Sequence, residues 1–157
     1  AEAEIAFVLN EDLRGPGIRK EDVISVTEKI FPCFEIVDSR INNWQIKIQD
    51  TIADNASCGV FLLGDGINYQ NDYELDKLEV KVSKNGEHLS SGYGSAVQGH
   101  PAEAVAWLAN TLGKYNIPLL KGEIILSGSL VPLEPAIAGD HFYMELIGIG
   151  DCEVYFS

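Results

Sequence analysis

The sequence has few basic side chains. Lysine and arginine together number 11, against 24 aspartates and glutamates, which gives a formal net charge of -13. A chain with this charge repels nucleic-acid phosphates and anionic membrane surfaces, so we predict no nucleic-acid partner and no membrane partner. The acidic excess favours a cation as the natural partner.

Long apolar runs and paired cysteines are also lacking. No run of 18 apolar residues occurs, and no basic segment precedes a shorter apolar one, so neither a membrane span nor a secretion signal is predicted. Cys33, Cys58 and Cys152 are odd in number and lie far apart without a C-x-x-C pair. We therefore expect reduced, mostly buried thiols rather than a disulfide framework or a zinc site, and a cytoplasmic location.

Methionine occurs only once, at Met144, so residue 1 is not a translation start. The chain also begins abruptly within an apolar run, which predicts that an upstream segment is missing. The 157 residues, 46% hydrophobic and 22% charged, are expected to form one domain over 1–157 with a substantial core.

Alternating and β-branched patterns predict that much of the chain is extended. The strongest local signal is a hairpin, because two alternating runs flank Asn85-Gly86, a pair suited to a type I′ turn. An alternating run at 44–48 leads into a polar turn, and a loop is predicted at 64–76. Further strands are predicted at 1–9, 33–41, 59–64, 123–131, 141–148 and 152–156.

Two segments have helical patterns. The first, 19–30, has acidic residues near its start and is expected to end before Pro32, and the second, 99–116, places Pro101 in its first turn. Because strands and helices do not alternate as β-α-β units, the sequence predicts an α+β fold, a mostly antiparallel or mixed β-roll with about two helices.

Three acids lie on predicted strands. Glu2 and Glu4 are two residues apart, so their side chains share one face of an extended chain, and Glu35 lies on the strand at 33–41. Three carboxylates could bind Mg²⁺ or Mn²⁺, which take oxygen ligands and leave positions open for a chelating substrate. A solvated acidic edge is the alternative explanation.

The polar run DTIADNAS, residues 50–57, follows an apolar stretch and contains Asp54, Asn55 and Ser57. Such runs are usually turns, but this one could offer hydroxyl and amide donors to a ligand carboxylate, and SGS at 127–129 has a similar character. No G-x-S-x-G elbow surrounds Ser57, and a lone His100 before a helix is better explained by capping or packing than by catalysis.

Several phrases together resemble the 2-oxopent-4-enoate (2-hydroxypenta-2,4-dienoate) hydratases of aromatic meta-cleavage pathways, within the fumarylacetoacetate hydrolase superfamily. The resemblance runs nearly end to end, corresponds to the C-terminal part of such proteins, and rests on AEAEIAFVL, DLRGPG, PCFEIVDSRI, IKIQDTIADNASCGVF, KNGEHLSSGYGSAVQGHPAEAVAWLANTLG and GEIILSGSLVPLEP. It implies the β-roll fold of the superfamily's C-terminal domain.

The resemblance also implies a site and a reaction. The family's E-x-E pair and third acid fall on Glu2, Glu4 and Glu35 as ligands of Mg²⁺ or Mn²⁺, and Ser57, with Asp54 and Asn55 as weaker candidates, would hold the substrate carboxylate. The implied reaction adds water to 2-hydroxypenta-2,4-dienoate and gives 4-hydroxy-2-oxopentanoate. The family's acid/base lysine lies in an N-terminal part that this sequence does not contain, so we assign no catalytic residue and expect the isolated chain to catalyse poorly.

Other functions remain open at this stage. The nearest is 4-oxalocrotonate decarboxylase, which shares the metal motif and acts in the same pathway, while C–C hydrolysis is disfavoured because no water-activating His-Glu pair is found. A non-catalytic assembly subunit is the alternative from another class. The resemblance further implies a homo-oligomer and a possible association with the decarboxylase.

Overall fold

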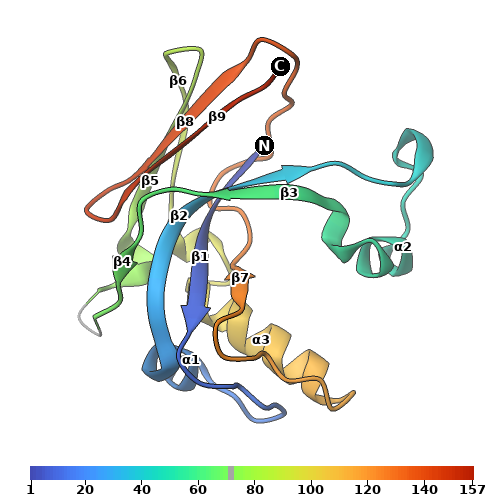
Figure 1. Ribbon diagram of the computed structural model, residues 1–157, viewed down its shortest axis with the longest axis vertical. Coiled ribbons are helices and arrows are strands. Elements are labelled where there is room, and N and C mark those ends of the chain that lie inside the picture. The colour runs from blue at the N-terminus through green and yellow to red at the C-terminus, as the bar shows by residue number, and fades with distance from the viewer. Residues whose placement is uncertain (71–72) are drawn as a thin grey trace.

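The computed structural model describes residues 1–70 and 73–157 (Figure 1). Over these residues it contains three α-helices and nine β-strands in two antiparallel sheets. The helices are α1 (Lys20–Val26), α2 (Ile48–Ala53) and α3 (Pro101–Gly113). The strands are β1 (Glu2–Leu9), β2 (Thr27–Val37), β3 (Cys58–Leu63), β4 (Ile67–Asn68), β5 (Glu79–Lys84), β6 (Glu87–Tyr93), β7 (Ile124–Leu126), β8 (His141–Leu146) and β9 (Gly150–Tyr155).

The predicted α+β fold of antiparallel sheets is confirmed, with one α-helix more than the two expected in the described part of the chain. Short 3₁₀ turns add to the helices at Asn42–Trp44, Asn55–Ser57, Leu75–Lys77 and Gly94–Ala96. The loop predicted at 64–76 contains the short strand β4 and the turn at Leu75–Lys77, and its residues 71–72 lie outside the described residues.

The first sheet has the strand order β3-β2-β1-β7, and β4 also pairs with β2. The central pair, β1 with β2, is long, and its register sets Glu2 opposite Glu35 and Phe7 opposite Ile30. Residues directly opposite in an antiparallel pair have side chains on the same face, so one face carries the acids and the other carries large apolar side chains.

The second sheet has the order β6-β5-β8-β9 and contains the predicted hairpin. Lys84 pairs with Glu87 across a two-residue turn, in which Asn85 and Gly86 have φ values of 55° and 84°. Both values are positive, as a type I′ turn requires, so the hairpin prediction is confirmed.

The apolar face of β1 and β2 forms the core together with the second sheet and α3. Phe7 and Phe34 are fully buried, and the ring of Phe34 meets that of Phe142 on β8 edge-on at a centroid distance of 6.3 Å. These contacts fix the first sheet against a rigid support, so the opposite, acidic face is held in a defined shape.

The predicted helix at 19–30 is wrong over residues 27–30. Helix α1 ends at Val26 and β2 begins at Thr27, so Pro32 lies inside a strand instead of stopping a helix. The β-branched residues there also suit a strand, and pairing with β1 extends the strand through them. Pro32 is tolerated because it lies where β2 passes from pairing with β3 to pairing with β4, and its carbonyl accepts from the amide of Gly64.

The alternating run at 44–48 is not a strand, and the strand predicted to reach residue 41 ends at Val37. Residues after Val37 leave the sheet, and α2 projects away from it in Figure 1. Helix α2 begins after Lys47, whose amide donates to the Asp50 carboxylate at 3.0 Å. A capping interaction of this kind supplies a local start signal that overrides a short alternation.

Helix α3 lies within the predicted range 99–116 and has Pro101 in its first turn, as predicted, and the His100 imidazole accepts from the amide of Ala102 at 3.1 Å. The interpretation of His100 as a capping residue is therefore confirmed. None of the helices in the described ranges has the length and apolar character needed to cross a bilayer.

Candidate metal and substrate site

Three carboxylates meet on one face of the β1–β2 pair. Glu2 lies opposite Glu35, and Glu4, two residues further along β1, points to the same side. One side-chain oxygen from each of the three lies within 4.8 Å of the other two. Strand pairing therefore brings the three predicted acids together, although they come from distant parts of the sequence.

Two of these acids are buried, and Glu2 is half-buried. Glu4 is 1% exposed and Glu35 is 7% exposed. Burial raises the pKa of Glu4 to about 8, and the nearby Glu35 and Glu2 add to this rise. The amide of Gly128 opposes the rise, because it donates to the Glu4 carboxylate at 2.8 Å. Burial, followed by the charge of Glu35, also raises the pKa of Glu2. Ionisation of all three acids is therefore unfavourable unless positive charge joins them.

The donor set fits a hard divalent cation. Among the described residues, no lysine or arginine forms an ion pair with Glu2, Glu4 or Glu35, so no basic side chain neutralises the cluster. Mg²⁺ holds its oxygen ligands at roughly 2.0–2.1 Å, so oxygens on opposite sides of one ion are about 4.2 Å apart. The three carboxylate oxygens, all within 4.8 Å of one another, are thus near enough to share one ion.

Apolar side chains share the acidic face. Phe61 on β3 lies opposite Glu35, and Leu63 lies opposite Cys33, which itself pairs with Glu4. Phe61 is 42% exposed, so accessible apolar surface lies directly beside the carboxylates. This combination suits a ligand that has an anionic, chelating end and a short carbon chain.

Ser57, the main candidate for a substrate contact, immediately precedes β3. It is 2% exposed, and its hydroxyl has no hydrogen-bond partner among the described residues. An unpartnered buried hydroxyl is costly, so this group is available to a ligand oxygen. The adjacent Cys58 pairs with Val37, two residues beyond Glu35, and burial followed by the nearby Glu35 raises the pKa of its thiol to about 11.

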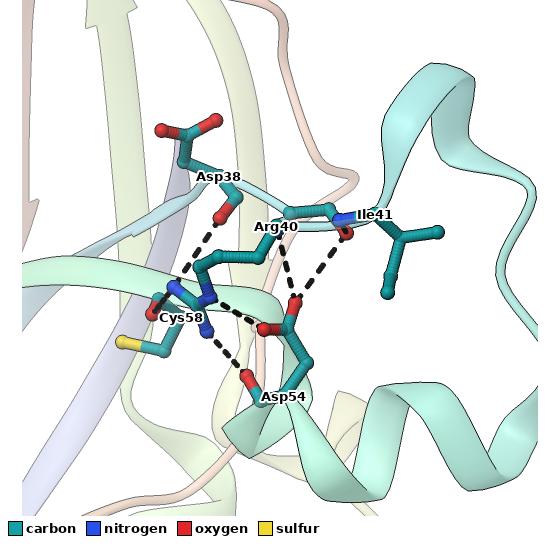
Figure 2. Close-up of polar contacts among 6 residues, drawn as sticks. Asp38, Arg40, Ile41, Asp54 and Cys58 are labelled. Atoms are coloured by element: carbon teal, nitrogen blue, oxygen red, sulfur yellow. Dashed lines mark hydrogen bonds and ion pairs between the residues drawn. The ribbon is translucent and has the colours of Figure 1, made fainter.

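Asn55 and Asp54 lie in the same turn but in different surroundings. The side chain of Asn55 is exposed, whereas Asp54 forms an ion pair with Arg40 (Figure 2). Although desolvation acts to raise it, the pKa of Asp54 is lowered by hydrogen bonds from Arg40, with a smaller contribution from Ser57, whose hydroxyl is near but outside hydrogen-bonding geometry. The Asp54 carboxylate is thus already engaged within the protein.

Sequence reasoning did not single out Arg40. Its guanidinium contacts the Asp54 side chain and the carbonyl of Cys58, the latter at 2.7 Å (Figure 2). The only signal was an isolated basic residue in a strongly acidic chain, placed near the end of the strand predicted at 33–41. Gly128 lies in the SGS segment that was noted, but its contact with Glu4 depends on tertiary structure.

Comparison with known proteins identifies the family pattern and close relatives. The pattern described as fumarylacetoacetate (FAA) hydrolase C-terminal matches residues 1–156. A 2-hydroxyhexa-2,4-dienoate hydratase of Comamonas testosteroni is 60% identical over 157 residues, covering 100% of this chain and 60% of that protein. A 2-hydroxypent-2,4-dienoate hydratase of Pseudomonas putida is 56% identical over 117 residues, covering 74% of this chain and 53% of that protein.

A solved structure is also similar. The 4-oxalocrotonate decarboxylase from Pseudomonas putida G7, complexed with magnesium and adipate, superposes with a TM-score of 0.94 at 34% identity and covers 99% of this chain and 59% of that one. The same decarboxylase is known complexed with calcium and acetate. The chain therefore spans little more than half the length of the relatives that it matches.

Proposed function

The chain belongs to the fumarylacetoacetate hydrolase C-terminal family, and from that membership we propose that it serves a metal-dependent hydratase acting on 2-hydroxypenta-2,4-dienoate. The product is 4-hydroxy-2-oxopentanoate, formed by net addition of one water in aromatic catabolism. The single observation that carries the proposal is the meeting of three carboxylates, two of them buried, with no lysine or arginine paired to them among the described residues, beside accessible apolar surface.

In this proposal Glu2, Glu4 and Glu35 hold one Mg²⁺ or Mn²⁺. When bound, the ion supplies a Lewis acid for the carboxylate and the 2-oxygen of the substrate. The buried position of Glu4 and Glu35 restricts water around the bound end of the substrate. The amide of Gly128 fixes one oxygen of Glu4, which leaves the orientation of that ligand determined before binding.

The groups around the acids orient the substrate. The unpartnered Ser57 hydroxyl donates to the substrate carboxylate, and the Asn55 amide is a second donor. Phe61 packs against the carbon chain, since it shares the acidic face and remains accessible. Asp54 reaches the substrate less directly, because Arg40 engages its carboxylate.

We assign no residue of 1–157 to proton transfer, and we propose that these residues form one catalytic domain that binds metal and substrate but turns over slowly when isolated. One buried cluster shared by both sheets supports the single domain. A turnover assay of the 157-residue chain beside a full-length relative tests the second point. Equal rates would contradict it.

Decarboxylation of 4-oxalocrotonate is the second candidate function, because the decarboxylase structure superposes closely on this chain. Greater identity to hydratases favours hydration. An assay with both substrates in the presence of Mn²⁺ separates the two activities, because only decarboxylation of 4-oxalocrotonate releases CO₂. Loss of dienoate absorbance without CO₂ supports the hydratase. Release of CO₂ from 4-oxalocrotonate, with no loss of dienoate absorbance, would refute the hydratase proposal.

We also propose a homo-oligomer in which residues 44–53, which include α2, contribute to an interface. The same surface is proposed for association with the decarboxylase. Trp44, Ile48 and Ile52 on this segment are 59%, 74% and 73% exposed. Exposed apolar clusters of this kind typically mark contact surfaces. Analytical ultracentrifugation of the wild type and an Ile48→Glu, Ile52→Glu variant tests the interface, and a wild type that is monomeric at micromolar concentration would contradict it.

A further inference from the structure

The segment that leads to Ser57 is not held by a hydrophobic core. From residue 38 to residue 56 no residue as a whole is buried and no apolar side chain joins the core, and Ser57 is the first buried residue after this stretch. Figure 1 shows the same segment, with α2, extending away from the sheet. Its position relative to the acids must therefore depend on polar contacts at its two ends.

Arg40 supplies most of those contacts. Its Nε donates to the Asp54 carboxylate and its Nη2 to the Asp54 carbonyl, while Nη1 donates to the Cys58 carbonyl at 2.7 Å (Figure 2). The Arg40 amide adds a bond to the Asp54 carboxylate at 3.2 Å. One guanidinium thus joins the start of the segment to residues on both sides of Ser57, which the fork of donors in arginine permits.

The turn between those anchor points has an unfavourable backbone. Asn55, Ala56 and Ser57 are consecutive, and their φ values of 51°, 57° and 62° all lie in the left-handed region. Residues other than glycine adopt this region at a cost, and they keep it only where neighbouring contacts enforce it. Beyond Arg40, the described turn has one further backbone tie to the start of the segment, from the amide of Asp38 to the carbonyl of Ser57 at 2.9 Å.

We propose that Arg40 is a positioning residue for the 2-oxo acid: it clasps Asp54 and Cys58, holds the left-handed turn, and so fixes Ser57 at the edge of the acidic cluster. This inference rests on the proposed function. It predicts that the affinity for metal and the affinity for the 2-oxo acid respond differently to loss of Arg40. The metal ligands lie on β1 and β2 and do not depend on the Arg40 contacts, whereas the substrate contact at Ser57 does.

The test uses the 157-residue chain, Mn²⁺ and oxalate as a mimic of the 2-oxo acid, measured by isothermal titration calorimetry. We expect Arg40→Gln to bind Mn²⁺ within twofold of wild type and to bind oxalate, in the presence of Mn²⁺, at least tenfold more weakly. Arg40→Lys should give an intermediate oxalate affinity, since one ammonium cannot bridge the same acceptors. Arg14→Gln is the matched control, because Arg14 pairs with the nearby Asp12 at 2.7 Å on an exposed surface and should leave both affinities unchanged.

Each result has a distinct meaning. Oxalate affinity of Arg40→Gln within twofold of wild type overturns the positioning role while leaving the proposed function intact. An equal loss of Mn²⁺ and oxalate affinity also overturns it, because that pattern indicates general destabilisation. If the wild type with Mn²⁺ fails to bind oxalate, the proposed function fails and the positioning role falls with it.

Asp54→Asn provides a second variant if Arg40→Gln does not fold. It keeps the bonds from Arg40 to the two carbonyls and removes only the charge of the carboxylate, so a smaller loss of oxalate affinity is expected, and no loss would refute the clasp. Hydrogen exchange of the amides at residues 55–58 should be faster in Arg40→Gln than in Arg14→Gln. Equal exchange rates would show that Arg40 does not hold the turn.

Discussion

Replacing Glu4 with glutamine should stabilise the metal-free chain while removing its response to metal. The folded state holds the Glu4 carboxyl with a pKa of about 8, against an ordinary value of 4.5. At pH 7 the unfolded chain therefore has an ionised Glu4, whereas the folded chain keeps most of it protonated. Glutamine has nearly the same shape as the protonated acid, and its oxygen can still accept from the amide of Gly128.

The magnitude follows from linkage. Keeping a proton on Glu4 at pH 7 costs the folded state up to about 3 kcal/mol relative to the unfolded chain, and Glu4→Gln removes that cost. For a chain of this size, 1 kcal/mol corresponds to roughly 2–4 °C in Tm. We therefore expect a Tm increase of several degrees at pH 7 in the presence of a chelator.

The pH dependence has a definite sign. Because the folded pKa of Glu4 lies above the unfolded value, its contribution to wild-type stability is fully present below pH 4.5 and is lost as the pH rises through about 8. The Glu4→Gln chain lacks this titration. Its Tm advantage should accordingly be small near pH 4.5 and grow toward pH 8.

The assay is thermal unfolding followed by circular dichroism, with chelator or with Mn²⁺. A ligand at 100 times its Kd stabilises the folded state by about 2.7 kcal/mol, so saturating Mn²⁺ should raise the wild-type Tm and leave that of Glu4→Gln unchanged. Glu28→Gln, an exposed glutamate on β2, is the matched control and should behave as wild type. Parallel pH curves for wild type and Glu4→Gln, or equal Mn²⁺ stabilisation of both, would refute the reasoning.

Further predictions concern the scaffold. Phe34→Ala should lower the free energy of unfolding by about 3–5 kcal/mol, since Phe34 is 1% exposed and packs on Phe142, and denaturant titration measures it; a loss below 1 kcal/mol would contradict this core. Hydrogen bonds from Lys84 and Asn85 hold the pKa of Asp140 at about 2, so acid should lower the wild-type Tm between pH 4 and pH 2 more than that of Asp140→Asn, and equal slopes would argue against these bonds. Gly86→Val should cost about 1–2 kcal/mol, because φ is 84° there, without changing Mn²⁺ affinity measured by calorimetry.

Several elements could be predicted because their signals are local. The hairpin needed only Asn85-Gly86 between alternating runs, and α3 needed only a capping residue and Pro101 before an apolar periodicity. The boundary between α1 and β2 could not be placed this way. Apolar residues there fit both a helix and a strand, and pairing with β1 decides between them. The helix end predicted at Pro32 was wrong for the same reason. Only the pairing of the neighbouring strands shows that β2 tolerates the missing backbone N–H of Pro32.

For the site, the chain alone determined that Glu2 and Glu4 share a face, because side chains alternate along any extended strand. Only the tertiary structure decided that Glu35 completes the group, since that depends on the register between β1 and β2. Burial of the acids, the bond from Gly128 and the clasp of Arg40 on Asp54 and Cys58 are likewise tertiary. The physical reason is that spacing along a backbone sets direction over a few residues, whereas distances between remote side chains exist only once strands have paired.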